Sequence, residues 1–157
     1  MGHPGEPVSS EAAPRPAPFL VADHPALDFV NSRAAPLGPW SEWLADGVDL
    51  LGWLVLTGTV DQEVAARFRG DTIAIDGAAA EARELRQWLR GFVERHAGSV
   101  LEVRDPAELG PLNRLLAQDD SYPQLTVVDH GLRLERQRRW SSPRQLLLPI
   151  GEAIADL

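Results

Sequence analysis

Apolar side chains recur at helical spacing along much of the chain, most clearly in one long segment. Between residues 76 and 98 they repeat every three or four positions, which places them on one face of a helix. They are Leu85, Trp88, Leu89, Phe92 and Val93. Asp76 is placed to cap the start of this helix, and Gly98 is placed to end it. We therefore predict a long amphipathic helix over residues 76–98, preceded by a loop or short strand at residues 71–77.

Several shorter segments combine an apolar face with a residue that favours the start of a helix, such as Ser, Asp or an early Pro. They are residues 25–31, 46–57, 61–69, 105–118 and 142–157. Two of them contain a later proline, Pro111 and Pro149, and an interior proline costs a helix about 3 kcal/mol. We expect a distortion at Pro111 and a kink or a break at Pro149.

One stretch near the C-terminal end has strand character instead. Residues 125–128 and 132–138 are β-prone or alternate between apolar and polar, and Asp129-His130-Gly131 supplies a turn between them. Together with the helices, this pattern predicts a single α+β domain that is mainly helical and has one antiparallel β-hairpin near its C-terminal end.

The first residues differ in composition from the rest. Residues 1–18 include five prolines and almost no side chain that could enter a core, so we predict a disordered tail ahead of a domain spanning residues 19–157. The sequence contains no targeting segment, and no run approaches the roughly 20 apolar residues that span a bilayer. We expect a soluble, cytoplasmic protein that makes no membrane contact.

Charge and cysteine content narrow the classes of function. The formal net charge is −8 at pH 7. An acidic domain repels a phosphate backbone, so we do not expect this domain to bind nucleic acid by itself. Residues 133–144 are rich in arginine and differ from this acidic background. We interpret them as a solvated hairpin face or a docking surface for a further module. The absence of cysteine excludes disulfides, cysteine-ligated zinc and thiol nucleophiles within the sequence.

The stretch HPALDFVNS at residues 24–32 places Asp28 and Asn31 among residues that otherwise resemble a core. A buried polar group without a partner costs about 1–3 kcal/mol, so each must be exposed, paired or part of a site. On a helix these two residues share an edge and could hold a polar ligand. Alternatively, they satisfy backbone amides and lock the N-terminal segment onto the domain.

Arginines at helical spacing on the long helix form a second candidate feature. Arg83, Arg86 and Arg90 could face inward and clamp a carboxylate or phosphate, or could form a solvated helix face. Arg86 adjoins the apolar side of the helix, and a buried Asp28–Arg86 ion pair would explain both residues without a ligand. Asn113, beside an apolar helix face, is a weaker candidate. The candidate ligand-binding residues are therefore Asp28, Asn31, Arg86 and Asn113.

Catalytic motifs are missing from the sequence. The four histidines show no metal-ligand spacing, and there is no nucleophile elbow, phosphate-binding loop or dinucleotide fingerprint. We expect no enzymatic activity, no cofactor and no metal in this chain. Two competing hypotheses stay open. One is a small hydrolase, which would need a concave site with two converging carboxylates or other ionisable groups. The other is a dimerisation module without a ligand.

Four pieces of the sequence together resemble a known family. HPALDFVNS at 24–32, DLLGWLVLTG at 49–58, LRQWLR at 85–90 and the pair Leu112-Asn113 occur in an order and approximate spacing that resemble the family over residues 20–157. The family comprises bacterial proteins that pair an ABATE domain with a C-terminal CGNR zinc finger.

The resemblance implies the regulatory or sensory half of a stress-induced transcription regulator. In such proteins the finger would bind zinc and contact DNA. This cysteine-free chain ends where the finger would begin, so we expect DNA contact only through that missing module. We hypothesise that a small molecule or protein partner binds near Asp28, Asn31 and Arg86, and that the final helix relays this binding to the finger. Homodimer formation stays open.

Overall fold

The computed structural model describes residues 15–20, 23–35, 38–98, 100 and 105–157. Its elements in chain order are α1 (Pro25–Val30), β1 (Arg33–Ala34), β2 (Ser41–Glu42), α2 (Gly47–Leu56), α3 (Gln62–Phe68), α4 (Thr72–His96), η1 (Pro106–Leu109), α5 (Gly110–Leu116), β3 (Tyr122–Val128), β4 (Gly131–Gln137), η2 (Pro143–Leu147) and α6 (Leu148–Ala155). The mainly helical α+β fold predicted from the sequence is confirmed. The predicted disordered tail lies outside the described residues except for residues 15–18.

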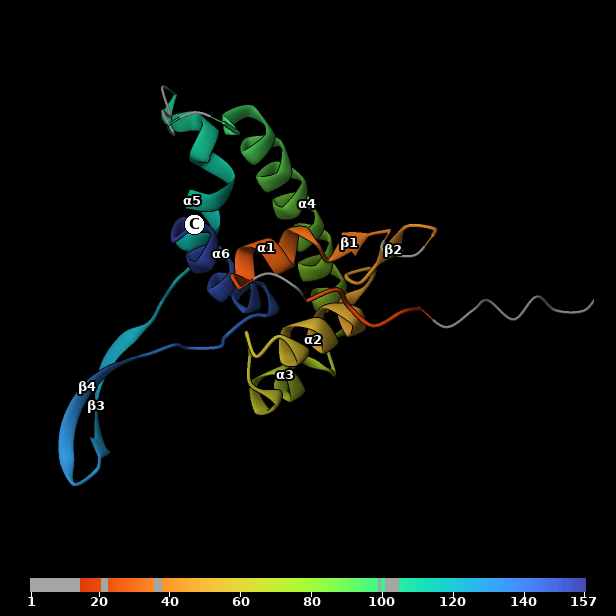
Figure 1. Ribbon diagram of the computed structural model, residues 1–157. Coiled ribbons are helices and arrows are strands. Elements are labelled where there is room, and N and C mark those ends of the chain that lie inside the picture. The colour runs from red at the N-terminus through yellow and green to blue at the C-terminus, as the bar shows by residue number, and fades with distance from the viewer. Residues whose placement is uncertain (1–14, 21–22, 36–37, 99, 101–104) are drawn as a thin grey trace, which may run out of the picture.

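The long helix α4 is the axis of the helical body (Figure 1). The helices α1, α2 and α5 and the 3-10 helix η2 all pack against it, and α6 contacts α1 and α5. No helix in the described part of the chain is long and apolar enough to cross a membrane.

The start of α4 differs from the prediction of a loop or strand at residues 71–77. The helix begins at Thr72, and the Asp71 side chain caps it by accepting a hydrogen bond from the Ala74 N–H at 3.1 Å. Helix formation here places Ile75 in the core. Asp76, predicted as the cap, instead accepts a hydrogen bond from the Gly47 N–H at 2.8 Å. That bond joins α4 to the first residue of α2.

Both interior prolines act as expected. The predicted helix over residues 105–118 consists of the 3-10 helix η1 followed by α5, and Pro111 lies at the start of α5. The last predicted helix likewise divides into η2 and α6, with Pro149 in the first turn of α6. In each case the proline sits where its missing N–H leaves no helical hydrogen bond unmade.

The predicted hairpin is formed by β3 and β4, which extend away from the helical body (Figure 1). Its two-residue turn contains Asp129 and His130, both with positive φ. This geometry matches the right-handed twist of a hairpin. A second, very short antiparallel pair, β1 with β2, was not predicted because two-residue strands carry no alternation.

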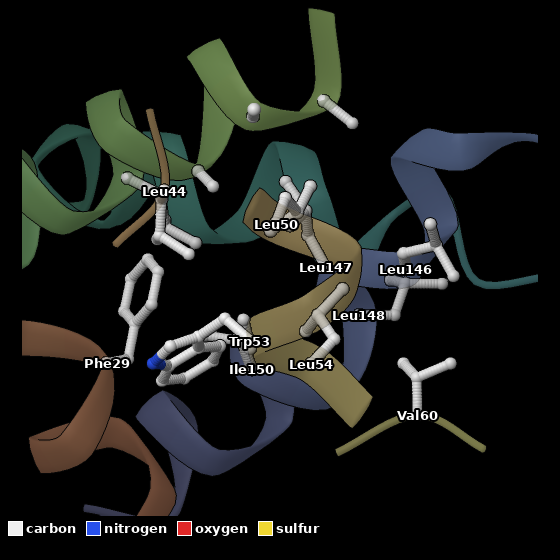
Figure 2. Packing of buried hydrophobic residues seen from close by; sticks show 14 of the residues in the cluster. Phe29, Leu44, Leu50, Trp53, Leu54, Val60, Leu146, Leu147, Leu148 and Ile150 are labelled. Atoms are coloured by element: carbon white, nitrogen blue, oxygen red, sulfur yellow. The ribbon is translucent and has the colours of Figure 1, made fainter. Parts of the chain in front are cut away.

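The core collects apolar side chains from α1, α2, α4, η2 and α6 (Figure 2). Phe29 and Trp53 meet edge to face, with ring centroids 6.1 Å apart. Leu146, Leu147 and Leu148 are all fully buried, so the apolar run at the η2–α6 junction packs into the core around α2 and α4. This packing fixes the position of α6 relative to the long helix.

Candidate functional site

Arg86 forms a buried ion pair inside the domain. Its guanidinium donates two parallel hydrogen bonds to Glu42, at 2.9 Å to Oε1 and 2.5 Å to Oε2. It also donates to the Ser32 hydroxyl at 2.8 Å, and that hydroxyl donates in turn to the Phe29 carbonyl. Arg86 is only 5% exposed. A forked pair of this kind is geometrically specific and stronger than a single hydrogen bond between neutral groups.

The neighbouring arginines of α4 bind the same N-terminal segment through its backbone. Arg83 donates to the Leu44 and Ala45 carbonyls at 2.7 and 2.8 Å. Arg90 donates to the Val30 carbonyl at 3.1 Å and to the Arg33 carbonyl at 3.4 Å. We call Arg83, Arg86 and Arg90 the arginine clamp. The alternative of a solvated helix face does not hold for these three residues, because Arg86 is bound to Glu42 in β2 and the other two donate to backbone carbonyls within or next to the β1–β2 segment.

The electrostatics of the clamp follow from its geometry. Partial burial by itself would raise the pKa of Glu42. Hydrogen bonds from Arg86 and from the Leu44 N–H, together with the charge of Arg86, outweigh that effect and hold the pKa below its ordinary value of 4.5. Glu42 is therefore ionised at neutral pH and neutralises the buried guanidinium.

The four candidate residues do not share one environment. Asp28 is half-buried in the first turn of α1, and Asn31 caps the C-terminal end of that helix. The carboxylate that pairs with Arg86 belongs to Glu42 and not to Asp28. Asn113 is exposed on α5 and lies in the wall of a separate cavity. The sequence did not indicate Glu42, which lies between Trp40 and Trp43 in the chain.

This cavity lies between α4, the η1–α5 segment and the end of α6, and we call it the apolar cavity. Its volume is about 500 Å³, and most of its lining residues are apolar. They are Trp88, Leu89, Phe92, Val93, Ala97, Leu109, Leu112, Leu116, Ile154, Ala155 and Leu157, with His96 and Asn113 as the polar members. Trp88, on the apolar face predicted for the long helix, is half-buried and forms part of this wall.

Aromatic rings and one polar cluster shape the wall on the α4 side. The ring centroids of Trp88 and Phe92 are 5.5 Å apart, and those of Phe92 and His96 are 4.6 Å apart. The Trp88 indole donates to the Glu108 carbonyl at 3.0 Å, and His96 Nε2 lies 3.2 Å from the Glu108 carboxylate. These contacts fix the rings, so the cavity is largely preformed.

Metal binding has no visible basis in the described part of the chain, where no three His, Asp or Glu side chains gather in a group that could hold an ion.

The structure is thus a mainly helical α+β domain with two features, the arginine clamp, whose arginines bind groups within the domain, and the open apolar cavity. The family model of ABATE, described as "Putative stress-induced transcription regulator", matches residues 23–157. The chain belongs to the ABATE family. No curated protein matches the sequence. No solved structure matches it either.

Proposed function

We propose that this chain is the sensory domain of a transcription regulator and that it binds a small, largely apolar molecule in the apolar cavity. The volume of about 500 Å³ supports this proposal, because small-molecule sites commonly enclose about 300–1,000 Å³ within mainly apolar walls. His96 and Asn113 supply polar groups that could orient one end of the molecule. The arginine clamp takes a structural role in this proposal, because its strongest donor is already bound to Glu42.

The position of the cavity suggests how binding is relayed. Ile154, Ala155 and Leu157 belong to its wall, so a molecule inside contacts the last turn of α6. A ligand shifts a conformational equilibrium only if it binds one state better than the other. We propose that occupancy favours one position of this turn, and that a zinc finger after residue 157, as the family resemblance implies, reads that position and contacts DNA.

A binding role accounts for the ionisable groups near the cavity better than a hydrolase does. His96 and Glu108 face each other, and Arg95 also donates to Glu108 at 3.0 Å. These groups are engaged with one another, and the described residues that line the apolar cavity include no carboxylate side chain. We therefore propose no catalytic step.

The apolar dye anilinonaphthalene sulfonate is expected to bind the full chain at one saturable site, with enhanced and blue-shifted fluorescence. Ala155→Phe should weaken this binding about tenfold, equivalent to about 1.4 kcal/mol, because the new ring occupies the cavity. Ala155 is exposed on the last turn of α6, so the fold should tolerate the change. Dye titration measures the affinity, and hydrogen exchange with and without dye measures the response of α6.

Ala107→Phe is the matched control, because Ala107 is also exposed but does not line the cavity. Its dye affinity should equal that of the unchanged chain. Equal weakening by both substitutions, or no protection of α6 on dye binding, contradicts the sensory role of this cavity.

A second candidate function, self-association, is favoured by the β3–β4 hairpin. Leu125 pairs with Leu134 and Val127 pairs with Leu132, so these four side chains share one face of the hairpin. They are between 63% and 75% exposed. We call them the apolar hairpin face. A two-stranded sheet with one uncovered apolar face is only marginally stable in water, so covering this face in a two-fold dimer stabilises the arm.

In that case, Leu134→Glu should raise the dimer dissociation constant about a hundredfold, because a two-fold axis introduces the charge twice into an apolar contact. Light scattering after size exclusion checks the mass against twice 17.2 kDa. Thr126→Glu, which lies on the opposite hairpin face and is paired with Arg133, should leave the dimer intact. If the unchanged chain is monomeric at every accessible concentration, this second function is ruled out.

A further inference from the structure

Residues 15–18, with the sequence Arg-Pro-Ala-Pro, lie against β2 and α2. The Trp43 indole N–H donates to the Pro16 carbonyl at 2.9 Å. The Arg15 guanidinium donates two hydrogen bonds to Asp49, at 2.5 and 2.6 Å, and a third to the Glu42 carbonyl at 2.7 Å. The Arg15 fork, bound to Asp49, and the Trp43 indole N–H thus attach this short segment to the domain at two adjacent points.

The sequence of this segment favours one conformation before it docks. Each proline fixes its own φ, and a residue that precedes proline avoids the α region, so Arg15 and Ala17 are both biased towards extended backbone. An extended polyproline segment leaves its carbonyls free to accept hydrogen bonds and loses little entropy on binding. Domains that bind proline-rich peptides use these properties, with aromatic side chains lining the groove.

An open groove lies between this segment, which forms one of its walls, and the outer face of α2. It has a volume of about 270 Å³, and its wall includes Trp43, Trp53 and the outer face of α2. Val48 and Leu56 on that face are 70% and 58% exposed, with Gly52 between them. Residues 15–18 thus cover Trp43 and Asp49 and leave Val48 and Leu56 exposed beside them, where a longer peptide could make contact.

The Asp49 carboxylate makes this surface complementary to a basic ligand. Hydrogen bonds from Arg15 lower the pKa of Asp49 below its ordinary value, and burial opposes this shift less strongly. Asp49 therefore presents an ionised carboxylate that selects an arginine one residue before the first proline. A lysine could pair with it only as a point charge, because it lacks the planar fork.

We propose that the surface formed by Trp43, Val48, Asp49, Gly52, Trp53 and Leu56, which lines this groove together with residues 15–18, is a recognition site for a partner peptide of the type Arg-Pro-x-Pro. Residues 15–18 bind Trp43 and Asp49 of this surface within the same chain and therefore compete with the partner. A segment tethered this closely acts at an effective concentration in the millimolar range, so a partner must bind tightly or arrive at high local concentration. The groove lies outside the apolar cavity, so this proposal does not depend on the proposed sensory function.

The test uses the full chain and a fluorescent synthetic peptide with the sequence of residues 11–20. Arg15→Glu in the chain should release the internal segment, because the new carboxylate meets Asp49. The Arg15→Glu chain should then bind the peptide at least about tenfold more tightly than the unchanged chain, as measured by anisotropy. The Trp43 indole N–H signal in NMR spectra should shift on peptide binding.

Two matched variants establish the role of the charge. A peptide carrying glutamate in place of its arginine should not bind the Arg15→Glu chain. The glutamate peptide should instead bind a chain that carries Asp49→Arg alone, because the internal segment of that chain has no glutamate to compete with it. In a chain that carries both Arg15→Glu and Asp49→Arg, the internal segment carries the same glutamate and competes with the peptide. Binding of both peptides with equal affinity to the Arg15→Glu chain, or no saturable binding of the original peptide to it, overturns the proposal.

Discussion

Replacing Glu42 by alanine is expected to lower the free energy of unfolding by about 3 kcal/mol, because it leaves the charge of Arg86 buried without a counter-ion. The Arg86 side chain is 6% exposed and would retain the Ser32 hydroxyl as its polar partner among the present contacts. The Glu42 side chain is 27% exposed, so water can replace part of the lost interaction, and we expect the lower end of the usual range of about 3–5 kcal/mol. Urea unfolding at pH 7 measures the change.

Two further variants separate an internal ion pair from a ligand site. Glu84→Ala removes an exposed carboxylate from α4 and should change stability by less than about 0.5 kcal/mol. Glu42→Leu combined with Arg86→Met should recover most of the lost stability, because apolar residues of similar volume often replace a buried ion pair without loss. A Glu42→Ala chain as stable as the unchanged chain would show that the clamp does not hold the fold together.

The Glu42–Arg86 ion pair also predicts that the free energy of unfolding depends on pH. The pKa of Glu42 is lower in the folded chain than its ordinary value of 4.5. Its contribution to stability is therefore complete above pH 4.5 and is lost as pH falls through the folded value. The stability difference between the unchanged chain and Glu42→Ala should shrink over that acid range and stay constant from pH 6 to pH 8. A difference that persists undiminished at pH 2 would contradict this linkage.

The helices could be predicted because their signals are local. Apolar periodicity and a capping side chain lie within a few residues of each other, as in α2, where Asp46 accepts from the Asp49 N–H. The predicted start of α4 was wrong because two aspartates compete for the capping position there. Asp71 and Asp76 are both plausible by sequence, and only the packing of α2 against α4 decides that Asp76 serves Gly47 instead.

The candidate site was harder to predict because its contacts are long-range. The inward orientation of Arg86 could be anticipated from its position beside the apolar face, but Glu42 is 44 residues away and no spacing rule links the two. The apolar cavity likewise depends on how α4, α5 and α6 meet, and Asn113 was its only member among the candidates. The contacts of residues 15–18 with Trp43 and Asp49 likewise span 27 and 34 residues of sequence, so composition alone could not indicate them.

Gly47→Ala is expected to lower the free energy of unfolding by about 2–3 kcal/mol, because α2 and α4 meet too closely at this point for a side chain. A Cβ added at Gly47 would lie 2.4 Å from Ile75 Cγ1 and 2.7 Å from the Ile75 carbonyl carbon. Rotation of the Ile75 side chain can move its Cγ1 atom away, but the backbone carbon can move only if α2 shifts relative to α4. Such a shift would also stretch the 2.8 Å hydrogen bond from the Gly47 N–H to Asp76. Thermal and urea unfolding both measure this change.

Gly52→Ala on the same helix is the matched control, and it should have the opposite sign. A Cβ at Gly52 would meet nothing within 4 Å, and the residue is exposed in the interior of α2. Alanine there restricts the unfolded chain and should raise stability by about 0.5–1 kcal/mol. Since both substitutions add the same methyl group to one helix, the difference between them isolates the contact with Ile75. If Gly47→Ala proved as stabilising as Gly52→Ala, α2 and α4 could not pack as closely as the Asp76 hydrogen bond requires.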